Sequence, residues 1–278
     1  VVGCTSVLIG SVALRAGTVG IGNYAFYGCI GLTDIYIPES VQTIGKGSFF
    51  GCGLPSVTLP AGLKKIGDYA FYQCAVLERV SLPLGLEKIG RSAFYSCTKL
   101  SKIDFPSTLT EIDAYAFYGC SSLTKVVLPQ SVKRLGENAF SRCSGLTSVS
   151  VGNGAVALGA RAFYECALLS EVSLGSSLVS VGESAFYGCT SLTRLILPNR
   201  LVSLGDSAFY GCTALESVTF GDGLKTIGDS AFYGCASLTA AALPAGVESI
   251  GSYAFRKCTA LTGIFLGNEL RSVGSYAF

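Results

Sequence analysis

A cysteine recurs about every 23 residues along this chain of 278 residues. Successive cysteines are separated by 25, 23 and 22 residues and then by 23 at every later step. Aligned on them, the unit reads A-F-Y-G-C-x-x-L-x-x-V-x-L-P-x-x-L-x-x-I-G-x-x. A fixed period in the twenties is typical of a solenoid, in which each unit forms one coil and neighbouring coils bury each other's apolar edges. The repeat therefore predicts one elongated array and no single closed core.

The array is expected to occupy residues 1–278 as one domain. Its first repeat, about residues 1–25, is irregular: Val1 and Val2 replace the aromatic pair, and two extra residues follow Cys4. The last coil is an ordinary repeat, whereas solenoid ends usually carry an atypical polar coil. We expect the chain to be part of a longer array, with a head-to-tail contact between copies as the alternative.

One coil illustrates how the unit is expected to fold. The alternation of Val218, Thr219 and Phe220 predicts a strand with one buried face, and Leu224 and Ile227 are expected to point inward after a corner. The segment SAFYGC is predicted to form a short helical turn, capped by the polar residue before it. The fold class is therefore a solenoid of 11 coils, with one parallel β-sheet face and short strands or helical turns on the other side.

The phenylalanine of each unit is predicted to stack on its copies above and below. A side chain that recurs at one position of every coil meets the same side chain in the neighbouring coils. The predicted aromatic spine consists of Phe26, Phe49, Phe71, Phe94, Phe117, Phe140, Phe163, Phe186, Phe209, Phe232, Phe255 and Phe278.

Composition excludes several function classes. The chain has no histidine, which removes the usual general base and the commonest metal ligand. The 20 basic and 18 acidic residues are scattered, so no basic stripe suggests nucleic acid as a partner. No apolar run is long enough to predict a membrane span in this segment. We expect a protein that is not an enzyme and that uses no cofactor.

The consensus L-x-x-V-x-L-P-x-x-L-x-x-I-G-x-x-A-F-x-x-C resembles the leucine-rich repeats of the BspA-like, treponeme-type class. The resemblance covers essentially the whole chain over eleven consecutive units. It implies a non-catalytic protein that is extracellular or attached to the cell surface, of a class often linked with adhesion to host proteins or to other cells.

The outward side of the predicted strands is the first candidate binding surface. In repeat proteins an exposed sheet of this kind is the usual binding surface, and mixed charges suit a protein or glycan partner. The alternative is that these side chains only keep the strands soluble. The candidate residues are Asp34, Tyr36, Arg79, Ser81, Lys102, Asp104, Lys125, Ser148, Ser150, Glu171, Ser173, Arg194, Ser217 and Thr219.

A column of tyrosines directly follows the spine and is the second candidate surface. Its rings are expected to stack with their hydroxyls in water, which is a structural role; as a row of exposed aromatics it would also suit self-association. The column consists of Tyr27, Tyr72, Tyr95, Tyr118, Tyr164, Tyr187, Tyr210 and Tyr233.

The twelve cysteines admit two interpretations. An even number in an extracellular chain is compatible with six disulfides. One cysteine per coil beside a buried phenylalanine indicates instead a small apolar filler, and coils that splay apart on this side leave the cysteines too far apart to bond. We expect twelve free thiols.

These patterns favour a surface recognition module that binds protein or glycan through the exposed sheet. A structural protein that assembles with copies of itself, end to end or through the tyrosine column, is the second hypothesis. An enzyme is disfavoured because carboxylates such as Asp104 and Glu171 lie three strands apart, about 14 Å, too far for paired acid and base work.

Overall fold

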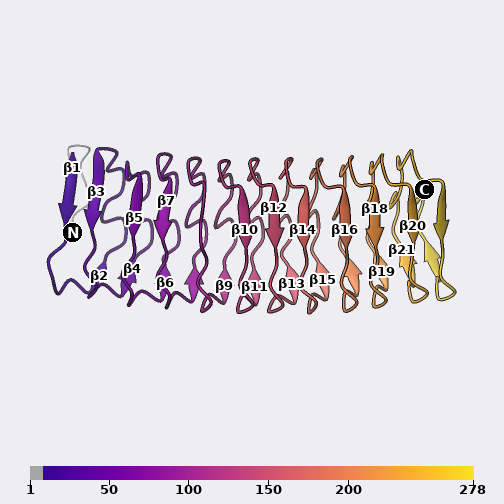
Figure 1. Ribbon diagram of the computed structural model, residues 1–278, viewed down its shortest axis with the longest axis horizontal. Helices are drawn as coiled ribbons and strands as arrows, with labels where there is room; N and C mark the ends of the chain where they lie inside the picture. The colour runs from indigo at the N-terminus through magenta and orange to yellow at the C-terminus, as the bar shows by residue number, and fades with distance from the viewer. Residues whose placement is uncertain (1–8) are drawn as a thin grey trace.

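The computed structural model describes residues 9–278 and shows a parallel β-solenoid. Figure 1 shows an elongated array that runs from β1 at one end to the C-terminus at the other, with strands arranged in an upper and a lower row and one coil, between β7 and β10, without an upper strand. Within the described residues no helix is present, and so none has the length and apolarity that crossing a membrane requires. The solenoid of about 23 residues per coil agrees with the sequence analysis.

The upper row of Figure 1 is called the first ladder here. Its strands run parallel, and most consist of three residues that pair with the residues one repeat away. They are β1 (Gly10–Ala13), β3 (Leu32–Tyr36), β5 (Ser56–Thr58), β7 (Arg79–Ser81), β10 (Lys125–Val127), β12 (Ser148–Ser150), β14 (Glu171–Ser173), β16 (Arg194–Ile196), β18 (Ser217–Thr219), β20 (Ala240–Ala242) and β22 (Gly263–Phe265).

The lower row is called the second ladder, and its strands form one continuous parallel sheet of twelve strands. Each strand has two residues, of which the second is buried in every coil up to β21. The strands are β2 (Gly20–Ile21), β4 (Thr43–Ile44), β6 (Lys65–Ile66), β8 (Lys88–Ile89), β9 (Glu111–Ile112), β11 (Arg134–Leu135), β13 (Ala157–Leu158), β15 (Ser180–Val181), β17 (Ser203–Leu204), β19 (Thr226–Ile227), β21 (Ser249–Ile250) and β23 (Ser272–Val273).

A glycine follows eleven of the twelve second-ladder strands, and at all of them except Gly22 it allows close approach of neighbouring coils. A Cβ on Gly182 would lie 2.7 Å from Leu158 O and 2.7 Å from Ala160 N, and the φ of Gly182 is outside the left-handed region. Asp113 occupies this position in one coil, and its backbone is not left-handed either. The glycines therefore serve close packing and not a special backbone conformation.

The predicted helical turn is wrong. Around Phe186, amide groups alternate between two acceptors: the N–H of Phe186 donates to Ala208 O of the next coil (2.8 Å), and the N–H of Tyr187 donates to Ser184 O of its own turn (3.1 Å). Ser184 (φ 53°) and Gly188 (φ 70°) have left-handed backbones that permit this alternation. The segment cannot be helical because half of its amides bond to the neighbouring coil.

The phenylalanine spine is present as predicted and lies in the core. Ring centroids from Phe26 to Phe278 are 5.0–5.8 Å apart, and every consecutive pair is stacked. The rings from Phe49 to Phe255 are fully buried. Each coil thus buries its apolar edge against two neighbours, as the repeat requires.

The eleven cysteines of the described residues are buried beside the spine, and ten of these are free. Each of these thiols donates a hydrogen bond to the phenylalanine carbonyl of the preceding coil; Cys166 Sγ, for example, lies 3.2 Å from Phe140 O. Cys29, however, is disulfide-bonded, so the expectation of twelve free thiols is wrong. That expectation assumed regular coils, and Cys29 adjoins the irregular first repeat; Cys4 lies outside the described residues.

Unlike the second ladder, the first ladder is interrupted and forms four separate sheets. The break between β3 and β5 coincides with a coil that is one residue short between Cys52 and Leu54. At residues 102–104 only a single bridge, Arg79 to Lys102, remains. In that coil Phe105 replaces the usual leucine, but Phe220 does so in the coil of β18 as well, where the ladder stays paired, so the ring alone does not explain the opening. The third break, between β14 and β16, has no comparable side chain beside it.

Candidate functional site

All fourteen predicted sheet-face residues lie on the outward side of the first ladder. In β7, for example, Arg79 and Ser81 are exposed and Val80 is buried between them. Twelve of the fourteen are exposed, and Ser148 and Ser150 are half-buried. The alternation read from the sequence therefore places every candidate side chain correctly, although their binding role stays a prediction.

The openings of the first ladder form shallow grooves on this face. The groove where β14 and β16 separate has a volume of about 450 Å³. It brings six of the predicted residues together: Lys125, Ser148, Ser150, Glu171, Ser173 and Arg194. The groove thus offers hydroxyl groups and side chains of both charge signs to one ligand.

Two further grooves lie at the other openings. One of about 410 Å³ is lined by Lys102, Asp104 and Lys125 together with apolar neighbours. The other, of about 260 Å³, is lined by Asp34 and Tyr36 beside β5. The structure therefore distributes many of the predicted residues over three neighbouring sites.

Sequence reasoning missed the apolar anchors of this face. The side chains of Tyr36, Val127, Ile196 and Phe265 occupy the same outward position of their coils and are between 50% and 69% exposed. Only Tyr36 was predicted as a site residue. The usable signal was a large apolar residue at a position that is otherwise serine, threonine, alanine or aspartate. Ser170 and Thr193, which precede β14 and β16, also line the groove at those strands and were missed.

The chemistry available on this face is that of recognition. Lys102 Nζ lies 2.9 Å from Asp104 Oδ2, but both side chains are at least 75% exposed, so water screens the pair. Among residues 9–278 no group of three or more His, Cys, Asp or Glu side chains could hold a metal ion. Polar contacts and apolar anchors on a rigid sheet suit the binding of a ligand.

The tyrosine column is a stack of half-exposed rings. Ring centroids are 4.6–4.9 Å apart from Tyr27 through Phe50 to Tyr118 and again from Tyr164 to Tyr233. Ser141 interrupts the column. Because the ring faces cover one another, mainly edges and hydroxyl groups remain for contact with another molecule.

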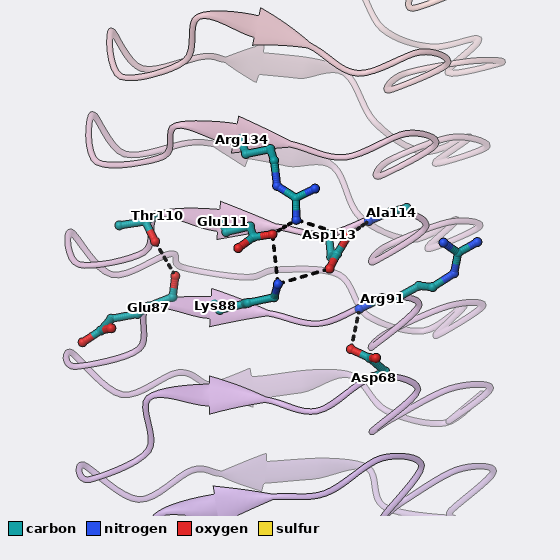
Figure 2. Close-up of polar contacts among 9 residues, drawn as sticks. All are labelled: Asp68, Glu87, Lys88, Arg91, Thr110, Glu111, Asp113, Ala114 and Arg134. Atoms are coloured by element: carbon teal, nitrogen blue, oxygen red, sulfur yellow. Dashed lines mark hydrogen bonds and ion pairs between the residues drawn. The ribbon is translucent and has the colours of Figure 1, made fainter.

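The outer side of the second ladder carries a network of paired charges in its middle coils. Lys88 Nζ lies 2.9 Å from Glu111 Oε1 and 3.3 Å from Asp113 Oδ2, and Arg134 pairs with Glu111 and lies 3.5 Å from Asp113 Oδ1. Figure 2 shows these four side chains pointing toward one another from three neighbouring coils. Their charges are satisfied internally, so this face offers no unpaired charge at these positions.

The geometry above agrees with the comparison to known families. The model of the BspA type leucine rich repeat region matches residues 19–147, 110–212 and 180–278, with six copies. The chain belongs to the BspA-type leucine-rich repeat family. Membership makes it a repeat module of a class that binds or recognises other molecules, and it confirms the fold class.

Solved structures of bacterial leucine-rich repeat proteins share this fold. The chain is similar to a leucine-rich repeat protein from Bacteroides ovatus (34% identity, TM-score 0.82, 96% of this chain and 75% of the other). It is also similar to a leucine-rich repeat protein of T. pallidum (33% identity, TM-score 0.52, 66% of this chain and 77% of the other). A third similar structure is a leucine-rich cell surface protein of Faecalibacterium prausnitzii (28% identity, TM-score 0.50, 89% of this chain and 69% of the other). Among curated proteins no match was found.

Proposed function

We propose that this BspA-type array is an extracellular or cell-surface recognition module and that it binds a protein or glycan through the outward face of the first ladder. The observation that carries the proposal is the groove between β14 and β16, where predicted face residues of both charge signs meet exposed Ile196. The similarity to a protein described as a cell surface protein supports the location.

Rigidity supports this role. Side chains on β12, β14 and β16 are held by a core that stacks through both neighbouring coils, so the groove is formed before a ligand arrives. A ligand that binds a preformed site loses less conformational entropy on the protein side. The exposed residues vary from coil to coil while the core repeats, so different coils present different chemistry to a ligand.

The proposal is tested by capture of ligands from a panel of immobilised extracellular matrix proteins and surface glycans. The groove variant carries Ser148→Glu and Ser173→Glu, which add bulk and negative charge beside Glu171. The control variant carries Ser203→Glu and Ser249→Glu, the same changes on the outward positions of β17 and β21. We expect at least about tenfold weaker capture for the groove variant alone, the range of a 1.4 kcal/mol loss.

Equal retention by both variants, or equal loss, would show that the groove does not bind the captured ligand. Urea denaturation of both variants establishes that each is folded.

Self-assembly remains the alternative function, through end-to-end contacts or through the tyrosine column. The column supports it because half-exposed rings form a continuous stripe over several coils. Light scattering at rising concentration tests it: a molar mass that stays at one chain disfavours assembly. A mass that rises in the native protein and not in a Tyr187→Ser, Tyr210→Ser variant would favour the column.

A further inference from the structure

Three consecutive coils carry a basic side chain at the same outward position of the first ladder. They are Arg79, Lys102 and Lys125, and all three are exposed. Arg79 and Lys102 are directly bridged, and the coil of Lys125 is the next along the array. Paired parallel strands lie about 4.8 Å apart, which is the spacing of Arg79 and Lys102, and Lys125 follows across the opening beside residues 102–104. Ser56 and Ser148 occupy the same position on either side, so the basic row has defined ends.

This row is poorly compensated within the protein. Like charges opposite one another on adjacent strands destabilise a sheet. In the described part of the chain Arg79 and Lys125 make no ion pair, and Lys102 contacts only the exposed carboxylate of Asp104. Three positive charges thus share one screened negative charge, which favours an anion from outside.

The second ladder of the same three coils provides an internal comparison. There the corresponding residues are Lys88, Glu111 and Arg134, whose charges alternate in sign and pair with one another. Figure 2 shows this compensated arrangement. The coils can therefore accommodate alternating charges, and the uniform sign of Arg79, Lys102 and Lys125 is a property of the first ladder alone.

The surface next to the basic row is hollowed. The groove of about 410 Å³ between Lys102 and Lys125 is also lined by the apolar residues Ile103, Phe105 and Val127 and by Asp104, which already pairs with Lys102. Apolar side chains beside cationic ones can hold the ring of a sugar while its acidic substituents reach the cations.

The spacing of the row selects among polyanions. Side chains on one side of an extended peptide recur every 6.8 Å or so, at about 3.4 Å per residue, which does not match a coil spacing of about 4.8 Å. Consecutive rings of a linear polysaccharide advance by a length close to the coil spacing. We propose that Arg79, Lys102 and Lys125 bind a linear acidic polysaccharide, with carboxylate or sulfate groups on successive sugars, lying along the solenoid axis. This inference rests on the proposed function and names the class of ligand.

Calorimetry with heparin fragments of defined length tests the inference, with hyaluronate as a polymer that carries carboxylate alone and dextran as a neutral polymer. We expect the native protein to bind at least one acidic polymer and not dextran. Affinity should fall about 30-fold between 50 and 200 mM salt, for roughly three released counterions. The variant Arg79→Ser, Lys102→Ser, Lys125→Ser should bind at least about tenfold more weakly than the native protein.

The matched control is Lys99→Ser, Lys133→Ser, Arg200→Ser, which removes three exposed positive charges outside the first-ladder strands. Its net charge equals that of the variant Arg79→Ser, Lys102→Ser, Lys125→Ser. This control should bind within about twofold of the native protein, because its losses lie outside the row. Equal weakening in both triple variants would overturn the site, since net charge alone would then explain binding. Binding of polyglutamate as tight as that of heparin would overturn the assignment to a polysaccharide.

Failure here can be told apart from failure of the proposed function. A native protein that binds no acidic polysaccharide, yet captures another ligand that the Ser148→Glu, Ser173→Glu variant loses, overturns this inference alone. If neither kind of ligand is captured, both are overturned.

Discussion

The two ladders of the solenoid are built by the same coils but differ in continuity and in charge. The second ladder pairs all twelve of its strands and balances the charges of Lys88, Glu111 and Arg134. The first ladder is divided into four sheets and leaves Arg79 and Lys125 without a charged partner in the described residues. One face therefore maintains the stacking of the coils, and the other is free to carry ligand-binding side chains.

The difference has a local cause. Most second-ladder strands are followed by a glycine whose backbone lies against the neighbouring coil, and in the described residues Asp113 is the one residue other than glycine at this position. The first ladder tolerates a missing residue before Leu54. A break there costs a few backbone hydrogen bonds, which water can replace on an exposed face.

The largest effect is expected from alkaline pH, which acts on the core that both ladders share. Burial raises the pKa of the thiols of Cys120, Cys166 and Cys212 from 9.0 to about 12. Their neutral form is favoured by folding, so this stability is complete below pH 9 and is lost as the pH rises through about 12. Each thiol accounts for at most about 1.4 kcal/mol per pH unit in that window.

Urea titrations at pH 8, 9, 10 and 11 measure this loss. The unfolding free energy should be constant near pH 8 and fall steeply above pH 9. A Cys120→Ala, Cys166→Ala variant should lose less over the same range, and parallel curves for the two proteins would exclude the thiols as the cause.

The next effect concerns the spine. Phe163→Ala should lower the free energy of unfolding by about 3–5 kcal/mol, because it removes a fully buried ring between two stacked neighbours. Thr219→Ala on the exposed side of β18 should change it by less than about 0.5 kcal/mol. Urea denaturation checks both, and similar values would contradict the inward and outward assignments.

A pair of glycine substitutions separates the ladders directly. Gly182→Ala should destabilise by about 1–3 kcal/mol, since the new methyl group meets the backbone of the preceding coil. Gly263→Ala in β22 has no atom within 4 Å of the new Cβ and should be neutral or stabilising by about 0.5 kcal/mol. Thermal unfolding of the two variants measures the loss of stability. A larger fall in Tm for Gly263→Ala than for Gly182→Ala would contradict the difference between the ladders.

The smallest effect concerns charge order. Glu111→Lys gives the second ladder four positive charges in a row, from Lys65 to Arg134, and should cost about 1 kcal/mol. Lys102→Glu gives the first ladder alternating charges and should leave stability within about 0.5 kcal/mol of the native value or raise it. Urea titrations at low and high salt measure both, and the gap between the variants should shrink at high salt. If salt does not change the difference in unfolding free energy between the two variants, packing and not charge is its cause.

Much of the candidate face could be predicted from the sequence, because strand alternation has a strict period of two. Val80 lies inside, and Arg79 and Ser81 lie outside, as their positions predict. The grooves could not be predicted, since they depend on where neighbouring strands separate. The sequence around Leu174 follows the ordinary repeat, so it does not predict that β14 and β16 lie in different sheets.

The cysteines show the same limit. Burial of the thiols beside the spine followed from one cysteine per coil, and ten free thiols bear it out. The disulfide at Cys29 did not follow, because it depends on how the irregular first repeat meets the regular array. A repeat predicts the environment of a residue only where the coils on both sides are also regular.

By itself the sequence determined the period, the coil, the buried phenylalanine spine and the side on which each strand residue lies. These follow from repetition, since a residue that recurs in every coil must stack on its own copies. Tertiary structure alone decided that the SAFYGC turn is not helical, that the second ladder is continuous and that the first one opens into grooves. Those outcomes depend on hydrogen bonds and close approaches between coils, such as that of Phe186 N–H to Ala208 O, and no pattern within one coil records them.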